Sequence, residues 1–371
     1  MKSSVRKKYL LDFPRLAWSI LVEGRYDYTF DLMPMHVRKM SFRKRLNVMA
    51  SGLNLLWRRS DPWSWPLRMQ VELTNVCNLR CPVCPAGRGE FERERGMMDL
   101  TLFENLMREV GSYLLDVFLW AWGEPLLHPE FGRAVEIAHQ YGVNTVISTN
   151  GMKLYEPEVR DQLLENPPLH LIVALDGLTD QTNSVYRVGA DVEKILTGVQ
   201  ELAEARHEAG QERPYLHMRY IVMKHNQHEL PELEAFAREN AFDFLALRTL
   251  SPVENAEKVH KNMVPEGTDY DPFGYEDGGQ EPGNDFICQK PFIFPTMLVD
   301  GTVVSCCQDV KASEPYGQFG SGTSFRKIWK GGRARRVRRT IRDRVEEVSF
   351  CRSCPYAGRS ENTCSVSITR L

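Results

Sequence analysis

Three cysteines lie within eight residues of one another, at Cys77, Cys81 and Cys84. They follow residues 67–73, in which apolar and polar side chains alternate, and this pattern predicts a half-buried β-strand. The thiols are therefore expected on a loop at the carboxyl end of a strand, where α/β barrels carry their chemistry. A [4Fe–4S] cluster takes four thiolates, so three cysteines leave one iron open to a small molecule.

The spacing Cys-x3-Cys-x2-Cys resembles the signature of the radical S-adenosylmethionine (SAM) enzymes. The resemblance implies that these three thiols hold the cluster and that SAM chelates the open iron through its amino and carboxylate groups. It also implies that Val83 packs near the adenine, and that reductive cleavage of SAM gives a 5′-deoxyadenosyl radical that abstracts hydrogen from substrate. The structural alternatives are half a zinc site, a disulfide with a spare thiol, or three buried cysteines.

The composition is that of an ordinary globular protein long enough for two domains, with 371 residues, 42% hydrophobic and 26% charged. The net charge of −2 gives no argument for nucleic acid, so we expect no nucleic-acid partner. Nine cysteines fall in two groups, which favours metal ligation in a reducing compartment over a disulfide framework. Because we find no secretory signal and no bilayer-spanning apolar run, the sequence predicts a cytoplasmic protein.

Residues 1–64 are basic and rich in large apolar side chains, and their pattern predicts two or three amphipathic helices. A helical extension packed on the following domain is the favoured interpretation, because apolar helix faces usually meet a core. The alternative is a basic amphipathic surface, within residues 1–60, that makes peripheral contact with a membrane or a lipid-linked substrate. Pro62 and Pro66 end this segment.

Residues 65–250 alternate short apolar strands with helices, which is typical of parallel strands with helices outside them. Strands are predicted at residues 67–73, 116–121, 143–148, 169–175, 215–223 and 243–248. Helices are predicted at residues 101–113, 130–140, 158–164, 192–209 and 229–240. Six such units predict an α/β fold, a partial (β/α)6 TIM-like barrel that is open on one side to admit substrate. The radical SAM resemblance implies the same fold.

Two short motifs at the ends of predicted strands resemble SAM-binding motifs of this family. Gly123 and Glu124 stand where the family has GGE, with Trp122 in place of the first glycine, and the resemblance implies contact with the amino group of SAM. Ser148 and Asn150 end the third strand, where the family often binds the ribose. The structural alternatives are a Gly-Pro turn for the first motif and a helix N-cap or Asn-Gly turn for the second.

The fourth predicted strand ends at Asp176, and Arg187 follows on the next loop. This arrangement resembles a pattern of radical SAM proteins that carry a SPASM or twitch extension. Arg187 is the candidate clamp for the SAM carboxylate, since guanidinium binds carboxylate bidentately, and a surface arginine is the alternative. Asp176 is the candidate catalytic acid or base, or else it orients its loop. His217 and Arg219 are candidates for a base by strand position only.

Residues 251–287 are rich in Gly, Pro, Asp and Glu, and we expect a linker or a lid there. Residues 288–371 hold the second cysteine group and the dipeptide Asp300-Gly301, a strong hairpin signal. Their landmarks resemble the twitch/SPASM auxiliary domain, which implies a small β-hairpin and helix unit with one auxiliary [4Fe–4S] cluster. The implied ligands are four thiols: Cys288, Cys306, Cys351 and Cys354.

Cys307 could replace Cys306 as a ligand, and Cys364 could be a spare or exchange ligand. A zinc knuckle held by four thiolates is the structural alternative. The arginine-rich run 333–344 is expected to be a solvated helix face, or to receive an acidic flavodoxin or ferredoxin that supplies electrons.

Two clusters in one chain suggest two electron tasks, and a fully ligated second cluster suits electron transfer from a substrate radical. We therefore expect a dehydrogenase-like radical SAM oxidoreductase acting on a polar small molecule, sugar- or aminocyclitol-like, with lipid-linked forms included. The first alternative is a maturase of a ribosomally made peptide or protein. The helical character of residues 1–64 disfavours it, because leader-binding winged-helix domains contain strands. The second alternative is a non-enzymatic iron–sulfur or zinc protein.

Overall fold

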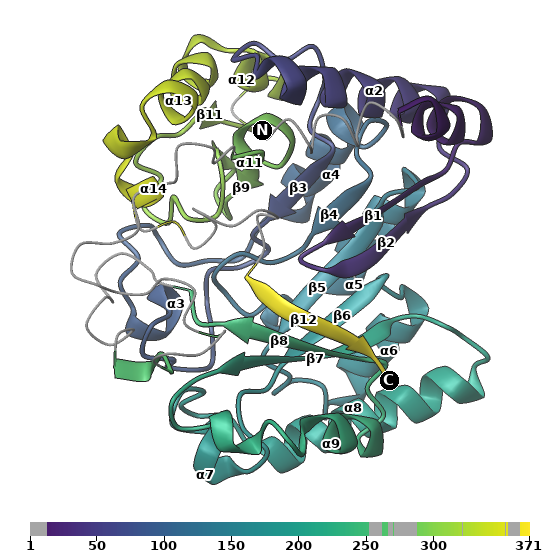
Figure 1. The fold of residues 1–371 in the computed structure, drawn as a ribbon, viewed down its shortest axis with the longest axis vertical. Helices are drawn as coiled ribbons and strands as arrows, with labels where there is room; N and C mark the ends of the chain where they lie inside the picture. Colours follow the sequence, from purple (N-terminus) through teal and green to yellow (C-terminus); the bar gives the residue numbers. More distant parts are fainter. Residues whose placement is uncertain are drawn as a thin grey trace.

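The computed structural model describes residues 13–251, 262–265, 270, 288–320, 322–352, 354 and 364–371. Most of the predicted linker or lid therefore lies outside the described residues. A ten-stranded sheet runs through the molecule, and a separate two-stranded hairpin lies against it (Figure 1).

Six parallel strands form the centre of the sheet, in the order of the sequence. They are β3 (Arg68–Val71), β4 (Asp116–Phe118), β5 (Asn144–Thr149), β6 (His170–Ala174), β7 (Tyr215–Val222) and β8 (Phe244–Thr249). The helices between them are α4 (Leu100–Val110), α5 (Phe131–Gln140), α6 (Pro157–Glu165), α8 (Val192–Glu208) and α9 (Leu233–Glu239). This arrangement confirms the partial (β/α)6 barrel.

Both faces of the central strands are covered, so their side chains are buried on alternate sides. In β6, Leu171 and Val173 belong to the core shared with the outer helices. Ile172, between them, belongs to a second core on the concave face of the sheet. Because the carboxyl ends of parallel strands lie at one edge, the loops that follow β3 to β8 gather there.

The N-terminal segment differs from the predicted all-helical extension. It contains the helix α2 (Phe42–Trp57) and the short η1 (Ser19–Glu23), but β1 (Tyr26–Phe30) and β2 (Met33–Val37) form an antiparallel hairpin between them. The helical prediction for these residues was wrong because the turn, Asp31-Leu32, has no glycine. Both turn residues nevertheless adopt left-handed φ angles of 52° and 65°, which hairpin turns normally take from Gly or Asn.

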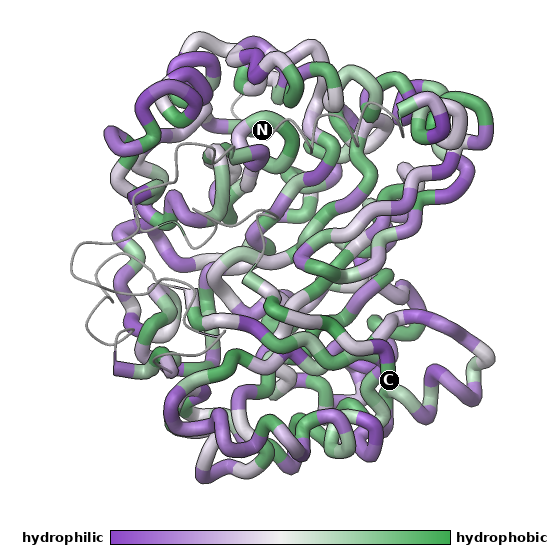
Figure 2. Tube along the Cα trace, viewed as in Figure 1, coloured by the Kyte–Doolittle hydropathy of each residue, from purple (hydrophilic) through white to green (hydrophobic). Residues whose placement is uncertain are grey.

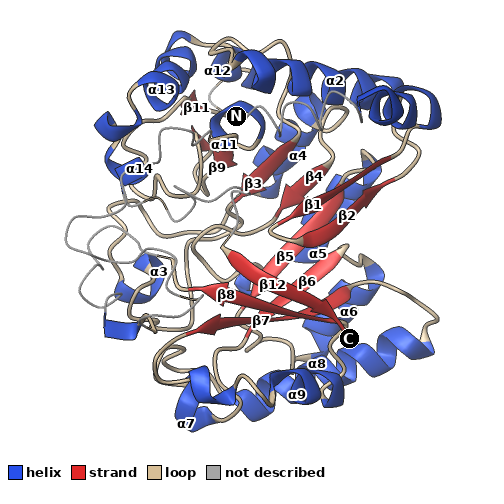
Figure 3. Cartoon of the chain, viewed as in Figure 1, coloured by secondary structure: helices blue, strands red, loops and turns tan. Residues whose placement is uncertain are grey.

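The hairpin fills the concave face of the barrel (Figure 3). Met33 and Met35 of the hairpin are fully buried in the second core. At the tip of the hairpin, Asp31 Oδ2 lies 3.3 Å from Arg219 Nη2 of β7 and 3.3 Å from Arg248 Nη2 of β8. The carboxylate of Asp31 also accepts a hydrogen bond from the Cys364 backbone N–H at 3.2 Å. Arg219, a candidate base by strand position, is thus held in an ion pair.

The C-terminal region continues the barrel sheet instead of standing apart from it. β9 (Thr296–Met297) pairs in parallel with β3, and the predicted Asp300-Gly301 hairpin is confirmed between β9 and β10 (Thr302–Val304). The remaining elements are α11 (Lys290–Ile293), β11 (Gly317–Gln318), α12 (Phe325–Trp329), α13 (Gly332–Asp343) and α14 (Ser349–Arg352). The last strand, β12 (Ser365–Arg370), pairs with β8 of the barrel. The final residues of the predicted auxiliary unit, 288–371, are therefore part of the barrel sheet.

Two histidines form a buried pair beneath the hairpin. His170 Nε2 lies 3.0 Å from the Pro34 carbonyl oxygen and must donate to it, so His170 Nδ1 accepts from His217 Nε2 at 2.7 Å. Burial lowers the pKa of His170 to about 4, and burial together with the neighbouring His170 lowers the pKa of His217 well below its usual value. His217, the other candidate base by position, also stacks on Phe244 with ring centroids 4.4 Å apart.

This pair makes the stability of the fold depend on pH. The unfolded chain binds protons on these rings below about pH 6.5 while the folded chain does not, so stability is full above that pH and falls as the pH drops. The His170 shift alone corresponds to about 2 kcal/mol lost by pH 5. His217→Phe should shrink the fall in thermal midpoint between pH 7 and pH 5, whereas substitution of the exposed His207 by Gln should not. An equal fall in all three proteins would contradict the buried neutral pair.

Candidate iron–sulfur and SAM sites

The first cysteine group lies on the loop between β3 and the short helix α3 (Pro85–Arg88). The Cys84 backbone N–H donates to the Cys81 carbonyl at 3.2 Å, and the Leu79 N–H points at the Cys77 sulfur at 3.5 Å. A Cβ at Gly87 would come within 2.5 Å of the Cys81 nitrogen, so only glycine lets α3 fold back on this loop. All three cysteines are free and belong to one apolar cluster.

The electrostatics of this loop suit a cationic group. Burial raises the pKa of Cys77 to about 12, and burial also raises the pKa of Cys81. Negative charge on Cys84 would raise both further, which shows that the three sulfurs are close enough to repel one another as thiolates. Three thiolates in one buried place need positive charge beside them, and an iron–sulfur core bound to them supplies it.

Arg187 provides a protein cation at the same place. Its Nη1 lies 4.0 Å from the Cys81 sulfur, and its Nε donates to Asp176 Oδ2 at 2.6 Å. Burial alone would lower the pKa of Arg187, but the Asp176 carboxylate together with negative charge on Cys81 and Tyr186 raises it. The guanidinium thus remains charged next to the cysteine loop.

Asp176 itself is fully buried, and both of its carboxylate oxygens are engaged. Oδ2 accepts from Arg187, and Oδ1 accepts from the Ile221 backbone N–H of β7 at 2.7 Å. This geometry favours a positioning role for Asp176 over the candidate role of catalytic acid or base, because the carboxylate is fully buried and each of its oxygens already holds a protein group in place.

Glu124 joins the loops that follow β4 and β5. Its buried carboxylate accepts from the Leu126 N–H at 3.0 Å, the Thr149 hydroxyl at 2.7 Å and the Asn150 N–H at 2.7 Å. Burial raises its pKa and these donors counteract the rise. A Cβ at Gly123 would lie 2.0 Å from the Thr74 carbonyl oxygen, so the loop approaches β3 only because this residue is glycine. Contact of this motif with the amino group of SAM stays a prediction.

The other residues predicted to bind SAM border the cysteine loop. Asn150 Nδ2 donates to Asn78 Oδ1 at 2.7 Å and lies 3.8 Å from the Cys77 sulfur. Val83 is 1% exposed and packs in an apolar cluster with Leu79 and Tyr186. Ser148 is half-buried near the end of β5, two residues before Asn150.

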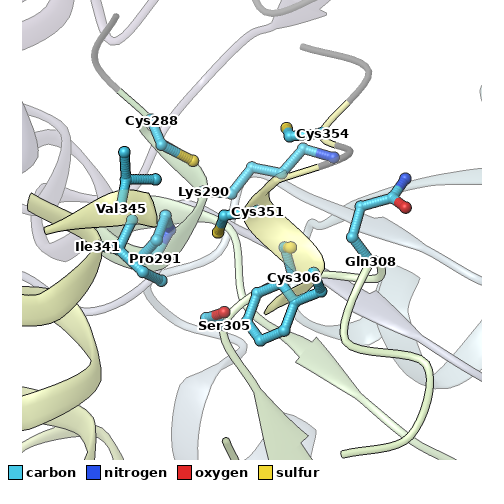
Figure 4. Close-up of a pocket in the computed structure, with 11 residues that line it drawn as sticks. Cys288, Lys290, Pro291, Ser305, Cys306, Gln308, Ile341, Val345, Cys351 and Cys354 are labelled. Carbon is cyan, nitrogen blue, oxygen red and sulfur yellow. The ribbon is translucent and has the colours of Figure 1, made fainter. Parts of the chain in front are cut away.

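The second cysteine group surrounds a cavity (Figure 4). The thiols come from four places in the chain, ahead of α11, after β10, within α14 and just beyond it, and the cavity is lined by Cys288, Cys306, Cys351 and Cys354. Burial raises the pKa of each of the first three of these thiols, and the neighbouring thiols raise that of Cys351 further. Among the described residues no three acidic, histidine or cysteine side chains are grouped as ligands of a single metal ion. The four thiols fit a cluster that occupies the space between them.

The cysteine spacing left open whether Cys306 or its neighbour Cys307 is the candidate ligand, and the two differ in their position relative to the cavity. Cys306 lines the cavity, whereas the Cys307 sulfur is 3.9 Å from the Lys290 ammonium and outside the lining. Cys364 is elsewhere, with its sulfur 3.2 Å from the Ser251 hydroxyl beyond the end of β8.

Two contacts between the sites were not predicted from the sequence. Trp122 Nε1 donates to the Cys307 carbonyl at 2.8 Å, which joins the loop after β4 to the auxiliary region. Arg93 binds Glu72 bidentately at 2.8 Å and 3.1 Å and donates to the Val310 carbonyl at 3.0 Å. The tryptophan in place of the family glycine was the available signal for the first contact.

Comparison with known proteins agrees with this geometry. Residues 71–237 match the model of the radical SAM superfamily, and residues 288–355 match the SPASM iron–sulfur cluster-binding domain. The chain belongs to the radical SAM superfamily and carries a C-terminal SPASM domain.

Relatives with curated names match the core of the chain. It is 29% identical over 191 residues to a tungsten-containing aldehyde ferredoxin oxidoreductase cofactor-modifying protein of Pyrococcus furiosus, covering 50% of this chain and 52% of that protein. It is 26% identical over 172 residues to the mycofactocin maturase MftC of Mycobacterium ulcerans, covering 46% and 44%. The chain thus spans about half the length of the curated relatives it matches.

Solved structures share the fold at low sequence identity. SuiB of Streptococcus suis bound to S-adenosylmethionine has a TM-score of 0.60 at 14% identity, covering 96% of this chain and 86% of that one. BtrN in complex with AdoMet and 2-DOIA has a TM-score of 0.50 at 19% identity, covering 78% and 92%.

Substitution of single cysteines tests the assignment of the second site. Reconstituted protein should hold about eight irons per chain, because each cube carries four. Cys306→Ser should lower iron to about four, since it removes a cavity thiol, whereas Cys307→Ser and Cys364→Ser should keep about eight. Iron and sulfide analysis with visible absorbance measures this. Loss of iron in Cys307→Ser but not in Cys306→Ser would reverse the assignment.

Substitution at the Arg187–Asp176 pair tests SAM binding. Arg187→Ala should weaken SAM binding roughly tenfold or more, because it removes a charge-assisted bond worth about 1.5–3 kcal/mol. Asp176→Asn should weaken it less, because the guanidinium remains but is less firmly held. Equilibrium binding to reconstituted protein measures this, with the exposed Arg238, which pairs with Glu234, changed to Ala as the control. Equal affinities for Arg187→Ala and the control would refute the clamp.

Proposed function

We propose that this chain is a radical SAM enzyme that modifies a ribosomally made peptide or protein. The observation that carries the enzymatic part is the pair of thiol sites in one chain, with Arg187 beside the triplet and four thiols around the second cavity. The substrate class is supported by relatives named as the mycofactocin maturase MftC and the PqqA peptide cyclase of Gluconobacter oxydans. The latter is 26% identical over 176 residues, covering 47% of this chain and 46% of that protein.

The cofactors would supply a 5′-deoxyadenosyl radical at the first site and an electron acceptor at the second. The role of the chain's own residues would be to bind the cofactor and substrate and to orient them. Arg187 offers a guanidinium for a carboxylate, and Val83 with its apolar neighbours keeps water from the space above the triplet. A substrate C–H group would lose a hydrogen atom to the 5′-deoxyadenosyl radical, and the substrate radical would then give one electron to the second site and one proton to a base, a two-electron oxidation in all. A flavodoxin- or ferredoxin-type partner would supply the one electron that cleaves SAM and take up the one electron from the second site.

A polar small molecule is the second candidate substrate. Two other relatives of this chain come from Methanosarcina barkeri. One is named Fe-coproporphyrin III synthase and is 26% identical over 163 residues, and the other is named AdoMet-dependent heme synthase and is 28% identical over 141 residues. These names support a small molecule, and not only a peptide, as the substrate of a protein with this core.

Anaerobic turnover tests the proposal. Reconstituted protein with SAM and dithionite should release 5′-deoxyadenosine, and Cys81→Ala should abolish the release because the triplet is broken. Short peptides encoded beside the gene, added to this reaction, should lose two hydrogens by mass spectrometry. Release of no 5′-deoxyadenosine by protein with intact clusters would overturn the enzyme. Oxidation of a sugar, aminocyclitol or porphyrin with peptides unchanged would replace the substrate class.

A further inference from the structure

Helix α2 presents its polar side to the protein and its apolar side outward. Its buried residues are Lys44, Asn47, Val48, Ser51 and Asn54, of which only Val48 is apolar. Four large apolar residues of the helix are exposed together with Arg43: Phe42 (68% exposed), Leu46 (48%), Leu56 (57%) and Trp57 (61%). Met49 and Leu55 are only partly buried against the core. This orientation is the reverse of the one expected for a helix packed on a core, where apolar residues face inward.

Hydrogen bonds fix the helix in this orientation. Lys44 Nζ donates to the Gly142 carbonyl at 2.6 Å, and Asn47 donates to the Tyr113 carbonyl at 3.2 Å and accepts from the Trp65 N–H at 2.8 Å. Asn54 Nδ2 donates to the Ser64 hydroxyl at 2.6 Å. Rotating α2 to bury its apolar side would take these hydrogen bonds away from the Gly142 and Tyr113 carbonyls and the Trp65 N–H, and each such group left buried without a partner would destabilise the fold.

The exposed apolar side of α2 is part of a larger apolar surface. Of the fifteen large apolar side chains exposed among the described residues, ten lie within residues 13–63. Trp57 and Trp63 contact each other edge to face, with ring centroids 5.7 Å apart, and the Arg59 guanidinium lies 4.2 Å above the Trp63 ring. Figure 2 shows apolar residues interspersed with polar ones along this part of the chain.

A strongly basic helix lies beside this surface. Arg342 of α13 donates to the Arg58 carbonyl at 3.0 Å, and Arg58 donates back to the Arg342 carbonyl at 3.1 Å, so α13 is bonded to the end of α2 (Figure 1). The outward arginines of α13 are exposed: Arg333, Arg335, Arg336 and Arg339. The apolar surface therefore has a cationic border, although the whole chain has a net charge of −2.

We propose that the outer face of α2, with Trp57, Trp63 and the arginines of α13, is a docking surface for an anionic lipid bilayer. Leucine, phenylalanine and tryptophan side chains on one helix face enter the boundary between headgroups and acyl chains, and tryptophan is enriched at that depth. Arginines at the border attract anionic headgroups. None of the described helices is long and apolar enough to cross a bilayer. Although Ile341 of α13 lines the second cavity, none of the residues named for this surface does, so the proposal is independent of the proposed function.

Vesicle flotation of the full-length reconstituted protein tests this surface. Wild-type protein should float with vesicles of phosphatidylglycerol and phosphatidylcholine, float much less with phosphatidylcholine alone, and detach as salt is raised. Leu46→Ser combined with Leu56→Ser and Trp57→Ser should reduce binding at least tenfold. Arg335→Glu with Arg339→Glu should abolish the preference for anionic vesicles. Tyr155→Ser, at an exposed aromatic residue on another face, is the matched control and should bind as the wild type does.

Iron content and absorbance of each variant check that the fold is kept. Failure of wild-type protein to float with anionic vesicles overturns the proposal, and so does unchanged binding by the triple apolar variant. Light scattering gives a further outcome: a wild-type dimer that dissociates in the triple variant, with no vesicle binding, makes this face a self-association surface and also overturns the proposal.

Discussion

Burying thiolates without losing their charge is the constraint on which this structure depends. An anion taken from water needs a cation or several donors beside it, or it becomes protonated. At the triplet the protein supplies Arg187, which Asp176 holds in place, and the iron–sulfur core supplies the rest. The second cavity has the same need, and Lys290 lies in its lining among the four cysteines.

Meeting this constraint requires loops from distant parts of the chain to converge, and the barrel provides that convergence. The loop after β3 holds the thiols. Bonds of Glu124 and Asn150 join the loops after β4 and β5 to each other and to it, and the Arg80 N–H joins it to the Val188 carbonyl of the loop after β6. The auxiliary region is bound to the same edge, because β9 extends the sheet beside β3 and Trp122 bonds the Cys307 carbonyl. The two thiol sites therefore belong to one continuous framework.

Local sequence patterns were sufficient for the parts of this protein that repeat or carry strong signals. The strand and helix alternation of residues 65–250 and the Asp300-Gly301 hairpin predicted features that the structure contains. The cysteine spacings predicted the family that the comparisons show. These signals are local, since apolar periodicity and turn chemistry depend on neighbours in the chain.

The features that were missed depend on tertiary contacts. The Asp31-Leu32 turn lacks glycine, and its hairpin forms because Met33 and Met35 fill the barrel and Asp31 meets two arginines. The periodicity of α2 showed two faces but not which one is buried, because that depends on carbonyls such as that of Tyr113. Spacing likewise could not separate Cys306 from Cys307, because only the folded chain shows that Cys306 is buried in the cavity lining while Cys307 is half-buried outside it.

The central claim is that the triplet leaves one iron open and SAM occupies it. Electron–nuclear double resonance on the reduced cluster of the Cys306→Ser protein, with SAM isotopically labelled in its amino nitrogen, measures this most directly. A hyperfine coupling between the label and the cluster is the predicted result. A cluster spectrum unchanged by SAM, in a protein that binds SAM by equilibrium measurement, would contradict the claim.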